Sequence, residues 1–266
     1  MQKKLSLVVA SFVLLGLSAC SLLPDKVDET ANWSVTKLYS EAREEMSGGH
    51  YERAILLFQK LESGYPFGTY AQQAQMEIAY AYYKSNDQAQ ALAAVERFIK
   101  LHPNHANVDY MYYLRGLINF NDQLGFLNFV YTQDPSERDP KATREAFAAF
   151  RLLVDKFPNS QYTPDALLRM KYLVNAMAQY EVHVARYYFR RGAYLAAVNR
   201  AQGALNDYRD APAIEEALYI ITRGYDKLGM IELRDDAERV FLKNYPNSKL
   251  LTADGAKAER HWWKLW

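Results

Sequence analysis

The stretch Arg97-Phe98-Ile99-Lys100-Leu101-His102-Pro103-Asn104 closes an apolar helical run with a proline, and the chain repeats this ending. An aromatic residue and a proline end similar runs at three further places, and a looser copy follows a fourth run. These endings are Tyr65-Pro66, Phe157-Pro158 and Tyr245-Pro246, with the looser copy from Tyr208 to Pro212. Self-similarity at a spacing of a few tens of residues indicates a repeat protein.

Small residues stand at fixed distances from these endings and identify the repeat. Ala54, Ala91 and Ala146 each lie 12 residues before a proline, whereas Tyr82 and Tyr225 each lie 21 residues before one. These offsets match the small, aromatic and proline positions of the tetratricopeptide repeat (TPR). Small residues also recur every 37 positions where paired helices must approach closely, and residues that tolerate the left-handed conformation fall at the turns between helices. The first set is Ala42, Ala79 and Gly116, and the second is Gly49, Asn86, Gly192 and Gly229.

The pattern predicts an all-α fold, a right-handed superhelical solenoid of five TPR helix pairs. The solenoid spans 34–248, with repeats at about 34–68, 70–105, 107–160, 163–210 and 212–248. The expected helices are 34–48, 51–63, 70–85, 88–101, 107–122, 140–156, 164–190, 194–207, 212–228 and 231–244. Asp139 before Pro140 and Thr163 before Pro164 indicate a capping oxygen followed by proline at the first helical position.

The N-terminus has the pattern of a lipoprotein leader. Lys3 and Lys4 precede the apolar stretch 5–17, and Leu17-Ser18-Ala19-Cys20 closes it with small residues. Thirteen residues reach about 20 Å, short of the roughly 30 Å of a bilayer core, which argues against a membrane-spanning helix. We therefore interpret 1–19 as a signal peptide, Cys20 as a lipidated N-terminus that anchors the chain in a membrane, and 20–33 as a linker. Ser21 favours the outer membrane; an ordinary signal peptide with a chance cysteine is the alternative.

Composition excludes several functional classes. The 266 residues carry 32 Lys+Arg against 31 Asp+Glu, a net charge of +1, so we expect no nucleic acid as the main partner. One cysteine excludes an internal disulfide and a cysteine-based zinc site. We find no phosphate loop, Gly-x-Ser-x-Gly elbow or His-Glu-x-x-His motif, and predict a protein that is no enzyme, with no metal and no cofactor beyond the lipid. His102 and His105, with Asp109 nearby, are better explained as a solvated turn.

Two segments depart from the repeat. Residues 123–139 are inserted between the helices of the third pair, where insertions of solenoids often bind partners. A loop folded onto the array and a partner contact remain equal alternatives. The tail 249–266 carries Trp262, Trp263 and Trp266. A packed cap on the last repeat is favoured over docking to a partner or to the membrane interface.

Two surfaces are candidates for binding. In TPR proteins the first helix of each pair lines the concave groove, and its positions here are rich in Tyr and Met, which suit an extended peptide with apolar side chains. The groove candidates are Tyr39, Met76, Tyr80, Tyr83, Lys84, Tyr110 and Tyr113, within a wider set that adds Thr36, Arg43, Met46, Gln73, Leu117 and Phe120. The second candidate surface combines arginines with aromatic residues, a composition typical of protein interfaces. It comprises the run 186–191, which includes Arg190 and Arg191, together with Arg200. Core packing and a solvated helix end are the respective alternatives.

Long ungapped stretches resemble the YfiO/ComL family of outer-membrane assembly lipoproteins, also called the BamD family. These stretches are 65–70, 78–84, 97–101, Asp109-Tyr110, 114–117, 138–140 and 157–162. The resemblance covers the mature chain to about Ser248 and leaves the tail unmatched. It implies a periplasmic five-repeat scaffold of the β-barrel assembly (BAM) machinery that works beside BamA and accessory BAM lipoproteins on barrel precursors. It also implies that the BamA contact lies in the C-terminal repeats, which include Arg190, Arg191 and Arg200.

The alternative function is a periplasmic TPR lipoprotein of cell-wall or envelope-division type that binds peptidoglycan-associated proteins. Proteins of this kind share the Phe-Pro-Asn-Ser repeat ending found at 157–160. A cell-wall enzyme would need a catalytic domain in addition, for which the repeats leave no room.

Overall fold

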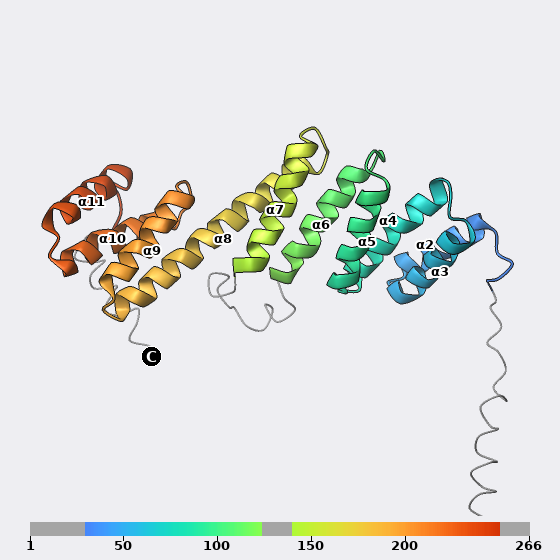
Figure 1. The fold of residues 1–266 in the computed structure, drawn as a ribbon, viewed down its shortest axis with the longest axis horizontal. Coiled ribbons are helices and arrows are strands. Elements are labelled where there is room, and N and C mark those ends of the chain that lie inside the picture. The colour runs from blue at the N-terminus through green and yellow to red at the C-terminus, as the bar shows by residue number, and fades with distance from the viewer. Residues whose placement is uncertain (1–29, 124–139, 251–266) are drawn as a thin grey trace, which may run out of the picture.

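The computed structural model describes residues 30–123 and 140–250, which form ten helices arranged as an elongated array in chain order (Figure 1). The pairs are α2 (Val35–Ser47) with α3 (Tyr51–Gly64), α4 (Thr69–Lys84) with α5 (Gln88–Leu101), α6 (Val108–Gln123) with α7 (Pro140–Lys156), α8 (Thr163–Arg190) with α9 (Tyr194–Asp207), and α10 (Ile214–Leu228) with α11 (Ile231–Asn244). No helix end differs from its predicted position by more than two residues. The structure therefore confirms the five TPR-like helix pairs.

Each helix packs against the next one along the chain, so the core is a row of local clusters and not one central core. A phenylalanine in the second helix of four pairs is fully buried. These residues are Phe58, Phe98, Phe150 and Phe241. Burial of a phenyl ring contributes about 1.5–3 kcal/mol, so these rings are major stabilising contacts between neighbouring helices.

The turn inside a pair requires a left-handed residue, as the sequence predicted. Asn86 has a φ of 62°, and glycines at 49, 192 and 229 have φ between 70° and 79°. A side chain with a Cβ is strained there, and Asn tolerates the conformation better than most residues do.

Close helix approach is clearest at Gly116. A Cβ built on this residue would lie 2.3 Å from Cε1 of Phe150, so α6 and α7 can pack this closely only because position 116 has no side chain. Ala42 and Ala79, at the equivalent positions of the first two pairs, are fully buried. The predicted step of small residues thus marks buried positions between helices.

The capping role predicted for Thr163 is wrong. Thr163 is the first residue of α8, and its hydroxyl donates to the carbonyl oxygen of Phe157 at 2.8 Å instead of capping the helix. The hydroxyl therefore stabilises the turn that precedes the helix.

Several predictions fall on residues that the structure does not describe. The signal peptide and Cys20, almost all of the 123–139 insertion, and the tail beyond Leu250 lie outside the described residues, as does Asp139. In the parts that are described, no helix combines the length and apolar character needed to cross a membrane.

Candidate functional site: a tyrosine groove and an arginine surface

The predicted groove residues lie on the first helices of the first three pairs. Tyr39 lies on α2, positions 76, 80, 83 and 84 on α4, and Tyr110 and Tyr113 on α6. All are half-buried except Lys84, which is exposed. Of the wider set, Met46 and Phe120 are buried and belong to the core. The name tyrosine groove is used below for the seven residues of the narrower set.

At its N-terminal end the groove is held by ring contacts between α2, α3 and α4. The Tyr39 ring packs edge-on against Phe58 and Tyr70, with ring centroids 5.8 Å and 5.3 Å apart. Arg43 of α2 and Glu77 of α4 form an ion pair beside it. Burial, together with the Glu77 carboxylate, raises the pKa of the Tyr39 hydroxyl. This end of the groove therefore presents a neutral phenol next to a paired charge.

In the middle of the groove, tyrosines from α4 and α6 share one environment. The rings of Tyr80 and Tyr83 lie 6.2 Å apart. Burial raises the pKa of Tyr110 well above its ordinary value, and the nearby phenol of Tyr80 and carboxylate of Glu77 raise it further. The structure thus brings together three of the predicted residues from two successive repeats.

At the C-terminal end, Tyr113 connects the groove to α8. Its ring stacks on Tyr162, with centroids 4.9 Å apart and an interplanar angle of 15°. Its hydroxyl donates to Oδ2 of Asp165 at 2.7 Å, and Nε of Arg169 donates to the same oxygen at 2.5 Å. Burial, and then the hydrogen bond to Asp165, raise the pKa of Tyr113 to about 12. Tyr113 therefore links the third and fourth helix pairs.

Sequence reasoning missed the three partners of Tyr113, namely Tyr162, Asp165 and Arg169. Burial raises the pKa of Asp165, but hydrogen bonds from Arg169 and Tyr113 outweigh it and hold the pKa below its ordinary value. The four-residue spacing from Asp165 to Arg169 is the only signal of this cluster in the sequence, and it equally fits a solvated helix pair.

The predicted arginine surface divides into two places. Arg190 and Arg191 are exposed at the end of α8, where the Arg191 guanidinium lies 5.6 Å from the Tyr187 ring centroid. Nη1 of Arg200 on α9 lies 2.9 Å from Oε2 of Glu181. Because Glu181 precedes Arg190 by nine residues of one helix, these two places are about 14 Å apart along the axis.

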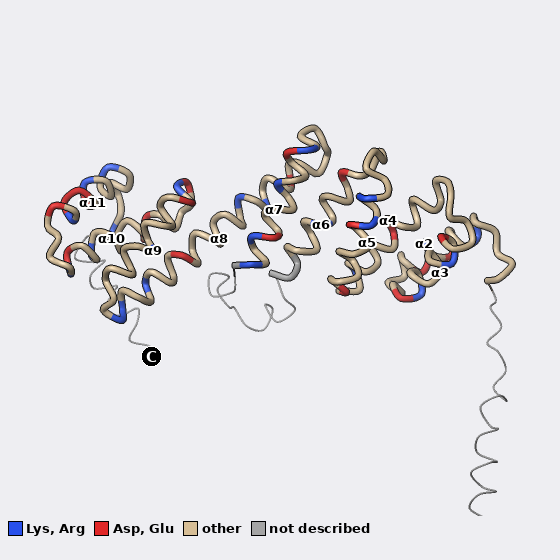
Figure 2. Tube along the Cα trace, in the orientation of Figure 1, with Lys and Arg blue, Asp and Glu red and all other residues tan. Residues whose placement is uncertain are grey.

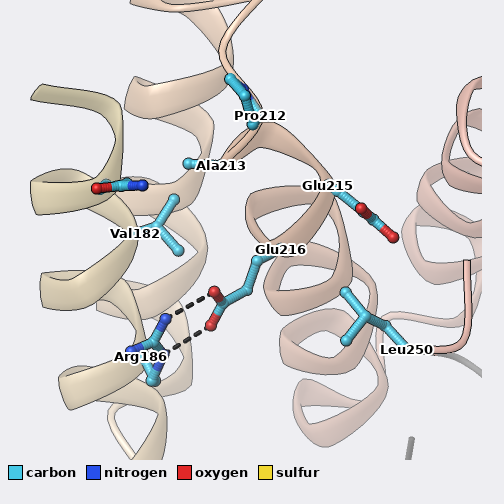
Figure 3. A pocket seen from close by; sticks show the side chains of 8 residues that line it. Val182, Arg186, Pro212, Ala213, Glu215, Glu216 and Leu250 are labelled. Carbon is cyan, nitrogen blue, oxygen red and sulfur yellow. Dashed lines mark hydrogen bonds and ion pairs between the residues drawn. The ribbon is translucent and has the colours of Figure 1, made fainter. Parts of the chain in front are cut away.

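Arg186, which opens the basic-aromatic run, has a structural role. Its Nε and Nη2 atoms donate to the two carboxylate oxygens of Glu216, both at 2.6 Å, and so join α8 to α10 (Figure 3). The pair lines a cavity of about 400 Å³ together with Val182, Pro212 and Leu250. We retain the name arginine surface for Arg190, Arg191 and Arg200 only.

Charges of both signs are spread along the whole array (Figure 2). In the described residues no group of His, Asp, Glu or Cys is arranged to hold a metal ion. His102 instead lies with its Nε2 2.9 Å from Oε1 of Gln75, and its ring packs on Phe98. The site therefore offers rings, hydrogen bonds and paired charges, which are the means of recognising another macromolecule.

A family model described as YfiO, outer membrane lipoprotein, matches residues 31–240, which include both surfaces. The chain belongs to the YfiO family of outer membrane lipoproteins. It is 47% identical over 268 residues to the outer membrane protein assembly factor BamD of Neisseria meningitidis serogroup A, with 99% of each chain covered. The BamD of Vibrio cholerae is 37% identical over 234 residues, covering 87% of this chain and 96% of that protein.

Among solved structures, the MamA protein overlaps this YfiO-family chain with a TM-score of 0.34 at 15% identity, covering 83% of this chain and 95% of that one. The TPR-like assignment rests on the ten helices themselves. The family confirms the resemblance seen in the sequence and the localisation predicted from it, an outer membrane lipoprotein.

Proposed function

We propose that this chain is the scaffold and substrate-recognition subunit of the outer-membrane β-barrel assembly machinery. Family membership supports the general function, because relatives that match the chain over nearly its full length are outer membrane protein assembly factors. The chain is not an enzyme and works together with other subunits of the machinery.

The tyrosine groove binds unfolded barrel precursors. The observation that carries this proposal is the row of half-buried tyrosines over α2, α4 and α6, with the carboxylate of Glu77 beside Tyr110. Tyrosines offer rigid apolar area and a polar hydroxyl at low entropic cost. Barrel strands alternate apolar and polar residues, so an extended precursor end presents an aromatic or aliphatic side chain at every second position.

The arginine surface binds the periplasmic domains of BamA. Arg190 and Arg191 are exposed, and Arg191 lies beside the Tyr187 ring. Arginine can pair with a carboxylate while its face stacks on an aromatic side chain. The 28 residues of α8 span about 42 Å and separate Arg190 and Arg191, at its C-terminal end, from the groove residue Tyr113, which contacts Asp165 at its N-terminal end. One protein can then hold a precursor and BamA at the same time.

The lipid at Cys20 holds both surfaces at the periplasmic face of the outer membrane, after removal of 1–19 and through the linker 20–33. Several acyl chains provide the multiple signals that stable anchoring requires. Cys20→Ala should leave the protein soluble in the periplasm or uncleaved at the inner membrane, as fractionation would show. Mature-length Cys20→Ala protein in outer-membrane vesicles would disprove anchoring through this residue.

Peptide binding tests the groove. Tyr80→Ala should weaken binding of a synthetic peptide from a precursor C-terminus by about 1 to 3 kcal/mol, measured by titration calorimetry. Lys100→Ala is the control, because Lys100 is exposed on α5, the second helix of the same pair, and lies outside the groove residues. Equal affinity of wild type and Tyr80→Ala, with unchanged circular dichroism, would remove Tyr80 from the site.

A further inference from the structure

The turn between α3 and α4 departs from the other repeat endings at one position. After the proline of the ending, three copies place an exposed asparagine, at positions 104, 159 and 247. The first copy places Phe67 there, and this ring is 91% exposed. It is the most exposed of the large apolar side chains that the structure describes. The equivalent position of the other three turns carries a polar residue.

The turn holds Phe67 outward. Pro66 restricts the backbone before it, and Gly68 after it has a φ of +99°, a conformation that L side chains rarely adopt. The Tyr65 backbone N–H donates to the carbonyl of Leu61 at 2.8 Å, and the Tyr65 hydroxyl donates to the carbonyl of Trp33 at 3.4 Å. The ring therefore stands on a turn that is fixed on both sides.

This turn lies at the end of the array where the lipid-bearing linker enters. Thr30, the first described residue, is buried. Its hydroxyl accepts a hydrogen bond from Nζ of Lys60 on α3 at 2.7 Å. Only ten residues separate Cys20 from Thr30, so the linker spans at most about 35 Å. Trp33, next to Tyr65, belongs to the same end of the molecule.

The composition of the turn suits a lipid headgroup region. Residues 63–76 carry no charged side chain, and the segment between α3 and α4 shows no charged residue (Figure 2). Nζ of Lys37 lies 4.2 Å from the Trp33 ring centroid at the same end of the array. Aromatic and basic residues of this kind anchor proteins at membrane interfaces. An uncharged aromatic turn can enter this region without desolvating an ion.

We propose that Phe67 inserts into the lipid headgroup region and forms a second, side-chain contact of the protein with the membrane that carries its anchor. The inference rests on lipid attachment at Cys20, because the short linker is what brings the turn to the bilayer. Phe67 then orients the array, and with it the groove, relative to the membrane surface.

Photocrosslinking in vesicles tests this contact. The photoreactive residue p-benzoylphenylalanine replaces Phe67 in one full-length lipidated protein and Asn104, the equivalent position of the next repeat, in another. Both are reconstituted in vesicles of phosphatidylethanolamine and phosphatidylglycerol, and lipid adducts are measured by mass spectrometry. Several-fold more lipid adduct at position 67 than at 104 is expected. Equal amounts of lipid adduct at the two positions would overturn the proposal. The same crosslinking in whole cell envelopes gives a second check, and the proposal fails if position 67 crosslinks there to protein and not to lipid.

Hydrogen exchange provides a second measurement on the natural side chains. Amides of 63–70 should exchange more slowly in vesicles than in detergent for wild type, and Phe67→Asn, which restores the residue of the other repeats, should abolish this difference. Persistence of the difference in Phe67→Asn would contradict the proposal. Vesicle flotation separates the two assumptions: protein that does not float disproves the anchor and the contact together, whereas protein that floats without the difference disproves the contact alone.

Discussion

The tyrosine groove and the arginine surface differ in how far their side chains are already engaged within the protein. In the groove, Tyr113 stacks on Tyr162 and donates to Asp165, and Tyr110 is half-buried with its ring against Tyr162. On the arginine surface, Arg190 and Arg191 are exposed, and among the described residues only Arg200 of these three has an acidic partner, Glu181. The groove residues therefore support the fold in addition to their proposed role in binding, whereas Arg190 and Arg191 are exposed and contribute little to the packing.

This difference predicts how mutations divide between stability and recognition. Removal of a groove ring opens a space between successive repeats, and in a solenoid each repeat is stabilised only by its neighbours. Removal of an exposed arginine leaves the packing unchanged.

The largest effect on stability is expected for Tyr110→Ala. Loss of this half-buried aromatic side chain, whose ring packs against Tyr162, should lower the free energy of unfolding by about 2 to 4 kcal/mol, measured by urea denaturation. Tyr83→Ala, on α4 of the preceding helix pair, should lower the free energy of unfolding less, because the Tyr83 ring packs against Tyr80 of its own helix. A Tyr110→Ala protein as stable as the wild type would show that the groove rings do not support the array.

Alanine substitution at two glycines compares α6, which carries groove residues, with α9, which carries Arg200. Gly116→Ala should lower the free energy of unfolding by about 1 to 3 kcal/mol, because the added Cβ would lie 2.3 Å from the buried Phe150 ring. Gly203→Ala on α9 meets nothing within 4 Å and should raise it by about 0.5 to 1 kcal/mol through the better helix propensity of alanine. Thermal unfolding of both variants measures the contrast, and equal changes would remove it.

Tyr113→Phe removes one hydroxyl and retains the ring. The lost hydrogen bond to Asp165 should cost about 0.5 to 1.5 kcal/mol at neutral pH. Because folding raises the pKa of Tyr113 to about 12 from an unfolded value near 10, its contribution is complete below pH 10 and is lost as the pH rises toward 12. The stability difference between wild type and Tyr113→Phe should therefore shrink over this interval, and a constant difference would argue against the buried phenol.

The smallest effect on stability is expected for Arg191→Ala. The side chain is exposed and its contact with Tyr187 is partly solvated, so the free energy of unfolding should change by no more than about 0.5 kcal/mol. Circular dichroism melts would check this. A larger loss would show that the arginine surface also belongs to the structural framework.

Local patterns predicted the fold because each TPR pair encodes its own helices. Asn86, the small residues at 42, 79 and 116, and the proline endings are all short-range signals, and the structure confirms the helices that they predict. Side-chain contacts between neighbouring repeats left no comparable signal. Tyr113 and Asp165 are separated by 52 residues. The insertion 123–139 lies between them, so the regular repeat spacing could not predict that they meet.

The arginines show the same limit. The sequence does not distinguish Arg186 from Arg190 and Arg191, because all three belong to one basic-aromatic run. Arg186 nevertheless pairs with Glu216, 30 residues later, and its guanidinium is engaged within the protein. Arg200 was grouped with the helix end, but its position beside Glu181 depends on how α9 packs along α8. Composition identified the type of surface, and only helix packing could show which of its members are exposed.

The most direct test of two separate binding surfaces measures two variants in two assays. Tyr80→Ala changes the groove, and Arg200→Glu combined with Glu181→Arg reverses the surface charge while it retains the internal ion pair. The assays are binding of a precursor C-terminal peptide and co-purification of BamA. We predict that Tyr80→Ala weakens peptide binding and retains BamA, whereas the charge-swapped protein loses BamA and retains the peptide. Equal impairment of both assays by either variant, or wild-type BamA yield with the charge-swapped protein, would contradict this account.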